Sequence, residues 1–227
     1  MAETDRPQDP NCDQSEDRRC RGRPQLRPDD ETRQIIYEAA RHQFAESGYA
    51  ATSMETVARS AGVSTKTLYR LVPNKAALFE GMVTDRLDRF LSEVNLRAID
   101  CAEIDEALYA ALLACASLSL DPEVIALQRM ILQETGKADL ARTLYQNGMA
   151  RNAAALADWL RRQQKRGLIA CEDTDEAAGF LLGMVAFVPQ RAAVFGGLPL
   201  PSKQQIEARV RHCVALFLRG CQAGARG

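Results

Sequence analysis

Apolar residues recur every three or four positions along most of the chain, which is the spacing of one face of an α-helix. One apolar stripe runs from position 30 to Gly48, and a longer one runs from Asn74 to about Ala98. Strand-like alternation of apolar and polar residues is scarce. The pattern therefore predicts an all-α chain of about nine helices.

Two short helices are predicted directly after the first stripe by their start and stop signals. Thr52 precedes Glu55 by three positions, the spacing of a capping box, so we expect Thr52 to cap the first of them. Gly62 follows where that helix must end, and Ser64 is placed to cap the second, over Thr65–Leu71. Two short helices joined by a tight glycine turn are typical of a helix-turn-helix.

Five more helical segments are expected after position 103. Their starts are marked by Asp or Ser at positions suited to helix caps, or by proline at the first helical position. The fourth should kink or end at Pro189, because proline lacks a backbone donor. The expected ranges are 104–120, 121–136, 139–167, 173–189 and 202–219.

Composition narrows the function classes. We find no apolar run near 18 residues and no secretory segment, so we expect no membrane span and a cytoplasmic, reduced location. The seven cysteines are scattered without a C-x-x-C, and there are only two histidines. A zinc site is therefore not expected, and neither is a cofactor. A redox-sensing cysteine is a less favoured alternative.

Charge is distributed unevenly around the two short helices. The whole chain carries a formal net charge of −1, but Thr56–Phe79 contains no Asp or Glu. Arg59, Lys66, Arg70 and Lys75 all fall in that stretch. Phosphate binding needs a local positive field and not a basic chain, so this stretch favours contact with nucleic acid.

Residues 1–29 are rich in Asp, Gln, Pro and Arg and nearly lack large apolar side chains, which predicts a disordered arm. Arg21-Gly22-Arg23-Pro24 within it resembles an AT-hook, in which arginines enter a narrow minor groove. A solvated tail that happens to contain arginines is the competing interpretation.

The string AATSMETVARSAGVSTKTLYRLVPNKAALF resembles the DNA-binding region of the TetR family of transcriptional regulators. Arg70 and Val72 depart from the aromatic residues usual in that pattern. The later string RMILQETGKADLARTLY is similar to the AefR-like type of C-terminal domain in the family. The resemblance implies a helix-turn-helix domain over 30–76 and a helical effector-binding and dimerisation domain over 77–227.

The resemblance also implies which residues contact double-stranded DNA. The start of the second short helix, at Thr65, Lys66 and Thr67, would approach base edges. Flanking hydroxyl and basic side chains would hold phosphates. The predicted DNA-contacting residues are Ser53, Ser64, Thr65, Lys66, Thr67, Tyr69, Arg70 and Lys75, together with Arg21 and Arg23 of the arm.

Two further sites are implied for the second domain. A cavity there would bind a small, mostly apolar effector, although each of its candidate residues is more often plain core. Its predicted lining is Phe90, Tyr109, Met130, Gln133, Tyr145, Trp159, Met184 and Phe187. The last two helices would form a homodimer contact. Its predicted residues are Phe180, Met184, Val185, Val210, Val214 and Phe217.

Taken together, these features indicate a ligand-responsive transcriptional regulator, with two rival classes. An enzyme is disfavoured because no nucleophile elbow, phosphate loop or metalloprotease motif occurs. A non-specific architectural DNA binder that uses the arginine arm is the other rival. It would prefer A·T-rich DNA without dyad symmetry.

Overall fold

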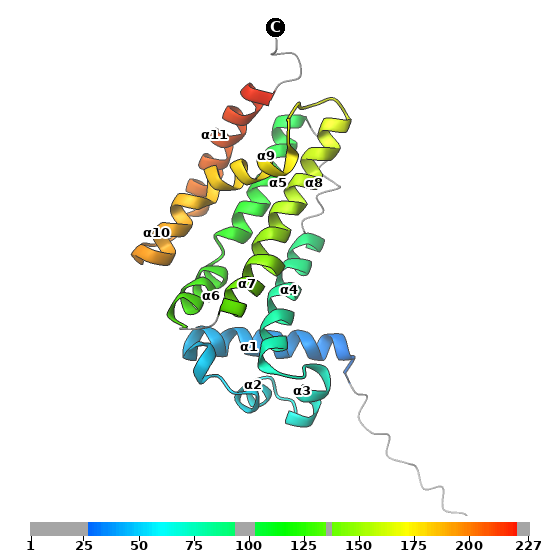
Figure 1. Ribbon diagram of the computed structural model, residues 1–227, viewed down its shortest axis with the longest axis vertical. Coiled ribbons are helices and arrows are strands. Elements are labelled where there is room, and N and C mark those ends of the chain that lie inside the picture. Colours follow the sequence, from blue (N-terminus) through cyan, green and yellow to red (C-terminus); the bar gives the residue numbers. More distant parts are fainter. Residues whose placement is uncertain (1–26, 94–102, 135–137, 222–227) are drawn as a thin grey trace, which may run out of the picture.

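The computed structural model describes residues 27–93, 103–134 and 138–221 of the 227-residue chain. Within these ranges it contains nine helical runs and no strand, as predicted. Helix α1, the two short helices α2 and α3, and the first half of α4 form a base that lies below a taller helical body (Figure 1). The helices of the base are α1 (Asp29–Ala51), α2 (Met54–Ser60), α3 (Thr65–Leu71) and α4 (Lys75–Glu93).

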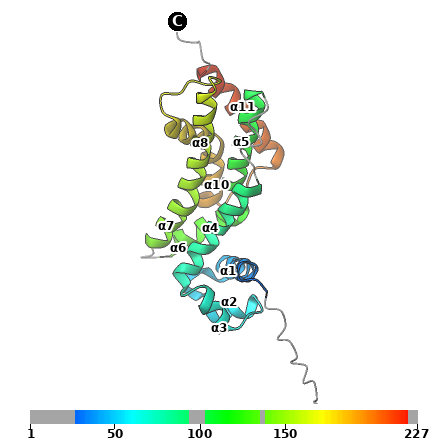
Figure 2. The ribbon, with the colours of Figure 1, turned by 90° about the vertical axis from the view of Figure 1, so that its right-hand side faces the viewer.

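The taller body contains two helical runs that change pitch part-way. Tyr145–Ala150 is a π-helical turn between α7 and α8, and Gly183–Phe187 is another between α9 and α10. Helix α11 packs along α5 (Figure 2). The helices of the body are α5 (Ile104–Ser119), α6 (Pro122–Gln133), α7 (Ala138–Leu144), α8 (Arg151–Lys165), α9 (Thr174–Leu182), α10 (Val188–Gly196) and α11 (Lys203–Cys221).

Most of the predicted helix starts are confirmed by side-chain caps. The Asp121 carboxylate accepts the backbone N–H groups of Glu123 and Val124 at the start of α6. Ser202 and Gln205 form a reciprocal capping box before α11, with N···O distances of 2.8 and 3.3 Å. The expected ends at Ala98 and Gly136 lie outside the described residues.

The prediction that Thr52 caps α2 is wrong. Ser53 is the cap, because its Oγ accepts the N–H of Thr56 at 3.1 Å. The Thr52 hydroxyl instead donates back to the carbonyl of Gly48, 2.7 Å away. Gly48 has a φ of 79°, which breaks the helical geometry of α1 at the predicted place and turns the Thr52 side chain toward α1.

Two expectations about Thr174–Gly196 need correction. Of the two outcomes expected at Pro189, a kink or an end, the end does not occur, because α10 continues through Pro189 to Gly196 after the π-helical turn at Gly183–Phe187. The run is also long and apolar enough to span a membrane by length and composition, contrary to the expectation that the chain contains no such run. Only 28% of its apolar window is buried inside the chain, so its exposed face requires another explanation.

The base and the body have separate hydrophobic cores. In the base, Phe44, Tyr49 and Phe79 pack with ring centroids 5.4 to 6.0 Å apart. Leu127 and Met130 of α6 belong to this same core, as do two leucines of α7. The helix-turn-helix unit is therefore packed directly onto α6 and α7.

The upper core joins α5, α8, α9, the second π-helical turn and α11. Trp159, Leu156 and Leu160 of α8 are fully buried against Leu108 and Leu112 of α5. This core holds the body together as a helical bundle, and α6 and α10 pack against each other beside it.

The corrected α2 cap generates a prediction. Ser53→Ala should lower the free energy of unfolding by about 1 kcal/mol, because one N–H of the first turn loses its acceptor. Hydrogen exchange at the Thr56 amide should accelerate in Ser53→Ala and remain slow in Thr52→Val. Acceleration in Thr52→Val alone would restore Thr52 as the cap.

Candidate nucleic-acid interface and effector cavity

Helix α3 presents a polar N-terminus and a buried underside. Leu68 is fully buried, whereas Ser64, Thr65 and Lys66 are exposed. The Ser64 hydroxyl accepts the Thr67 N–H at 3.0 Å and also lies 2.8 Å from the Thr67 hydroxyl. The Ser64 cap thus fixes the start of α3, while the side chains of Thr65 and Lys66 remain exposed to solvent.

Several of the predicted phosphate-binding side chains already have partners. The Arg70 guanidinium donates two 2.8 Å hydrogen bonds to the Asp29 carboxylate at the start of α1. The Tyr69 hydroxyl donates to Glu55 at 3.3 Å. The Lys75 ammonium donates to the Ala50 carbonyl at 3.1 Å and lies over the Tyr49 ring. The Ser53 hydroxyl is used by the α2 cap, while Arg21 and Arg23 lie outside the described residues.

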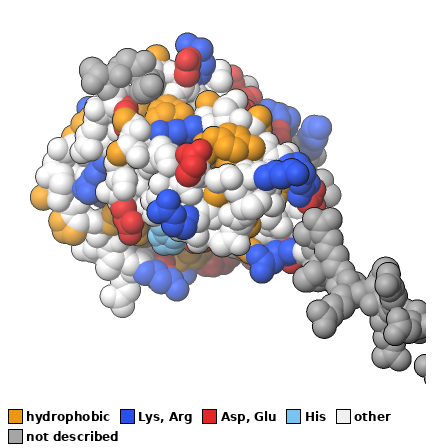
Figure 3. All heavy atoms as spheres, turned by 90° about the horizontal axis from the view of Figure 1, so that it is seen from below, with side chains coloured by type: hydrophobic (Ala, Val, Ile, Leu, Met, Phe, Trp, Pro, Cys, Tyr) orange, Lys and Arg blue, Asp and Glu red, His pale blue; other side chains and the backbone are white. Residues whose placement is uncertain are grey.

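The stretch Thr56–Phe79 contains no Asp or Glu, but the fold places carboxylates from elsewhere in the chain next to it. Glu55 immediately precedes Thr56–Phe79 in the sequence and Asp29 lies 27 positions before it, and the fold brings both carboxylates into contact with α3 side chains. Hydrogen bonding to Arg70 lowers the pKa of the Asp29 carboxyl, because the guanidinium stabilises the ionised form. Figure 3 accordingly shows Asp and Glu side chains among the Lys and Arg of the face seen from below.

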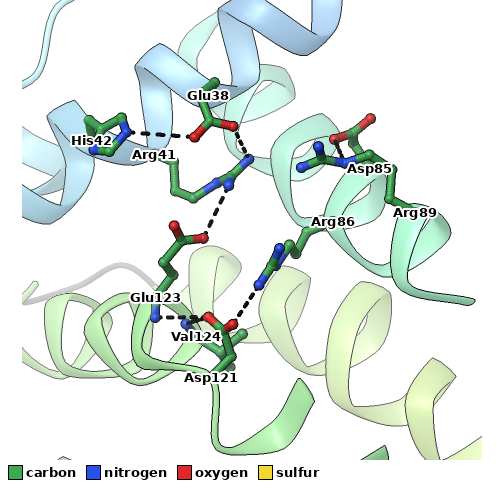
Figure 4. Close-up of polar contacts among 9 residues, drawn as sticks. All are labelled: Glu38, Arg41, His42, Asp85, Arg86, Arg89, Asp121, Glu123 and Val124. Atoms are coloured by element: carbon green, nitrogen blue, oxygen red, sulfur yellow. Dashed lines mark hydrogen bonds and ion pairs between the residues drawn. The ribbon is translucent and has the colours of Figure 1, made fainter. Parts of the chain in front are cut away.

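Helix α6 is connected to the helix-turn-helix unit at both of its ends. At its start, Arg41 of α1 donates to the Glu123 carboxylate at 3.1 Å (Figure 4). At its end, the Glu134 carboxylate accepts the backbone N–H of Ala50 at 2.7 Å. Arg86 of α4 also contacts α6 through its cap, with 2.5 Å between Arg86 Nη2 and Asp121 Oδ2. Movement of α6 must therefore act on both α1 and α4.

A cavity of about 220 Å³ lies above these contacts, between the base and the body. Its walls come from α1, α4, α5, α6, α7, the two π-helical turns, α8, α9 and α10. Apolar side chains form most of the lining: Met82, Val83, Leu87, Leu118, Val124, Leu127, Leu144, Met149, Leu182, Ala186 and Phe187.

Four polar side chains in the cavity wall carry buried atoms that lack a hydrogen-bond partner. These atoms are Nε and Nη2 of Arg41, Nε of Arg86, Nε2 of Gln128 and Oδ1 of Asn152. Arg41, Gln128 and Asn152 are at most 9% exposed. Leaving such a group unsatisfied costs about 1–3 kcal/mol, so their concentration around one cavity requires a functional explanation.

The predicted ligand residues are dispersed. Phe187 lines the cavity, while Tyr145 lines a shallower hollow between α6, α7 and α10. Trp159 is buried in the upper core, and Met130 in the lower one. The remaining four lie outside the 220 Å³ cavity: Phe90 on α4, Tyr109 on α5 against the upper core, Gln133 at the end of α6 and Met184 in the second π-helical turn.

The predicted dimer residues divide by burial. Val185, Val210 and Val214 are buried in the upper core and do not reach the surface. Phe180 is 61% exposed and Met184 is 36% exposed, so these two remain available. Phe217 is half-buried beside them.

Sequence reasoning missed the polar residues of the cavity, although a signal was present. Asn152 stands four positions before Leu156 and eight before Leu160, on the inward face of α8. Gln128 similarly follows buried Ile125 by three positions. A polar residue at a position where the helical pattern expects an apolar one indicates a buried polar group. Only the fold shows that these groups border the same cavity.

Sequence profiles identify both parts of the chain. Residues 36–82 match the profile described as bacterial regulatory proteins, tetR family. Residues 106–222, more than half of the chain, match the AefR-like transcriptional repressor C-terminal domain. The chain belongs to the TetR family. It is a DNA-binding transcriptional regulator and not an enzyme, as the sequence predicted.

Solved structures give the same family. A TetR-family regulator of Mesorhizobium loti is 28% identical, with a TM-score of 0.75, and the match covers 86% of this chain and 99% of that one. The flavonoid-responsive regulator FrrA is 27% identical, with a TM-score of 0.65 and coverages of 86% and 100%. FadR of Bacillus subtilis, solved in complex with stearoyl-CoA, is 19% identical, with a TM-score of 0.62 and coverages of 82% and 98%. At this identity the match shows only that the two proteins share a fold. No curated protein matches the chain.

The described residues of this TetR-family chain contain no cluster of three or more metal-ligating side chains. Two of the described cysteines, Cys115 and Cys213, do not resemble activated thiols. Burial raises the pKa of the Cys115 thiol to about 12, so it is protonated at neutral pH. Burial also raises the pKa of Cys213.

Cys115 should therefore resist alkylation. In the folded protein at pH 8, iodoacetamide should leave Cys115 unmodified, whereas denaturant should make it reactive, because the thiolate is the reacting form. Mass spectrometry of the peptides after labelling measures this. Rapid native labelling of Cys115 would contradict its burial and reopen the redox alternative.

Proposed function

We propose that this TetR-family regulator is a cytoplasmic repressor that binds an inverted-repeat operator as a homodimer and releases it when a small, mostly apolar effector binds. The observation that carries the proposal is the position of α6. It forms part of the cavity wall and also contacts α1 through Glu123 and Glu134. A ligand that displaces α6 would therefore displace the DNA-binding unit.

The exposed start of α3 would contact the bases. Thr65 and Lys66 lie on its outer surface and would enter the major groove, where a lysine favours the O6 and N7 acceptors of guanine. Thr67 is half-buried and shares its hydroxyl with Ser64, so it would act mainly in placing the helix. Two such helices in a dimer would contact half-sites about 34–36 Å apart.

Phosphate binding would involve an exchange of partners. Tyr69 and Arg70 lie on α3 and Lys75 begins α4, but each has an intramolecular acceptor in the DNA-free protein. A phosphate would compete with Asp29 for Arg70. The pair therefore lowers non-specific affinity and holds the guanidinium in place.

The dimer would form on the exposed apolar face of α9 and α11. Phe180, Met184 and Leu216 line one groove there, and Leu216 is 63% exposed. A Cβ added at Gly179 or Gly183 would meet nothing within 4 Å, so these glycines have no packing role inside the chain. They leave room for a second helix to approach closely, which explains the apolar surface of Thr174–Gly196 without a membrane.

Selection of bound DNA from a random pool at physiological salt tests this function. A dyad-symmetric motif with half-sites one helical turn apart is expected, and Lys66→Ala should relax base preference within each half-site. A·T-rich DNA without a dyad, selected equally well by Lys66→Ala, would instead favour the architectural DNA binder.

The Asp29–Arg70 pair provides a second prediction. Asp29→Asn should raise affinity for all DNA sequences alike and steepen the salt dependence of log K by about one unit, because Arg70 gains a phosphate. Asp30→Asn is the matched control. It removes the same charge one residue away but breaks only a pair with Arg33. Equal effects of the two substitutions would mean that Arg70 does not contact phosphate.

The dimer face provides a third prediction. Leu216→Glu should convert the protein to monomers in sedimentation experiments and reduce operator affinity, because a charge would be buried in an apolar contact. Leu132→Glu is the control, since Leu132 is 58% exposed on α6, away from this face. Circular dichroism checks that both variants are folded. A folded, dimeric Leu216→Glu protein would rule out this interface.

A further inference from the structure

We propose that the cavity binds a small apolar molecule carrying one carboxylate, and that Arg41 and Gln128 hold this carboxylate. The inference rests on the proposed ligand response and specifies its ligand class. It also adds a residue of the DNA-binding unit, Arg41 of α1, to the ligand site.

The unpartnered groups define the chemistry of the ligand. Four of the five atoms are donors: Nε and Nη2 of Arg41, Nε of Arg86 and Nε2 of Gln128. Only Oδ1 of Asn152 is an acceptor. A carboxylate offers several acceptor sites and no donor, and its bonds to guanidinium groups are among the stronger ones in proteins. A ligand rich in donors would leave most of these groups unsatisfied.

The donors left over in the lining suit a single anionic group. Arg41, Arg86 and Glu123 are the charged residues of the lining, and Arg41 also lies near Glu38 while Arg86 is paired with Asp121, so the site has no net positive charge. Arg41 keeps two nitrogens without a hydrogen-bond partner, Nε and Nη2, and Arg86 keeps one, so Arg41 has more donors available to a ligand. The Glu123 carboxylate opposes an anion, but its side chain is 41% exposed and already accepts from Arg41, so its repulsion is partly screened.

Volume and lining limit the body of the molecule. A cavity of about 150 Å³ is known to bind benzene, so by proportion 220 Å³ holds roughly nine non-hydrogen atoms. The walls opposite the polar groups are aliphatic or aromatic, as at Leu87, Leu118 and Phe187. An alkylbenzoate or a medium-chain fatty acid has this size and polarity, whereas a nucleotide or a sugar phosphate has neither.

The carboxylate would also provide the link to α1. Arg41 Nη1 donates to Glu123 and Nη2 lies 3.3 Å from Glu38, while Nε has no partner. A ligand carboxylate at Nε would share the guanidinium with Glu123. It would thereby weaken one of the two contacts by which α6 is held to α1.

Calorimetric titration of the full-length protein in the absence of DNA tests the site. The probes are benzoate, 4-ethylbenzoate and octanoate, each compared with its primary amide. At least one carboxylate should bind about tenfold or more tightly than its amide, because the amide adds donors and removes the charge. Amides that bind as tightly as the acids, or three carboxylates that show no saturable binding, would overturn the proposal.

Two variants assign the binding to residues. Gln128→Leu should weaken carboxylate binding about tenfold while leaving the melting temperature of the free protein unchanged or higher, because Nε2 has no partner to lose. Arg41→Met should weaken the acid and leave its amide almost unaffected. Arg151→Met is the control, because it breaks the 2.6 Å pair with Asp88 outside the cavity.

Unchanged acid affinity in both Gln128→Leu and Arg41→Met would overturn the assignment. Loss of acid affinity in Arg151→Met to the same extent would do so as well, since it would indicate a general loss of fold. These titrations contain no DNA. Their failure would therefore reject the carboxylate site and leave the operator selection to decide the proposed function.

Discussion

The two carboxylates that join α6 to α1 are the contacts on which the arrangement of this protein depends. Glu123 holds Arg41 at one end of α6, and Glu134 holds the Ala50 amide at the other, close to the turn into α2. Between them, Leu127 and Met130 of α6 pack into the core of the DNA-binding unit. Because both ends and the middle of α6 are engaged, it cannot move without moving α1.

The same helix also faces the rest of the body. Arg129 donates to the Ala193 carbonyl of α10, and Gln128 reaches the cavity from the neighbouring position. Helix α10 continues from α9, whose exposed face is the proposed dimer surface. Cavity, dimer surface and DNA-binding unit are therefore connected through one short helix. A ligand can change DNA affinity only if it binds more tightly to one position of α6 than to another, and the change in affinity cannot exceed that difference in binding.

The elements could be predicted from the sequence because their signals are local. Glycine at 48, serine at 64 and the Asp121-Pro122 pair mark helix boundaries through backbone geometry and capping, which depend on a few adjacent residues. The error at Thr52 was also local. Two adjacent hydroxyl residues can both cap, and only the turn at Gly48 determines which one does.

The sites were harder to predict because they combine distant residues. Arg41, Gln128 and Asn152 come from three helices, and nothing in their own neighbourhoods indicates that they border one cavity. Asp29 lies 41 positions from Arg70, so the acid-free stretch gave no sign of this pairing. Periodicity correctly found Val185 and Val214 on apolar faces, but it could not separate the core side of a helix from its exposed side.

Reciprocal binding tests the central claim most directly. The affinity of the tightest-binding carboxylate should be measured with and without saturating operator DNA. Thermodynamic linkage requires operator to weaken ligand binding by the same factor by which ligand weakens operator binding, typically 5- to 150-fold for coupled sites. We expect weaker ligand binding in the presence of operator. Equal affinities in the two titrations would show that α6 transmits nothing between the cavity and the DNA-binding unit.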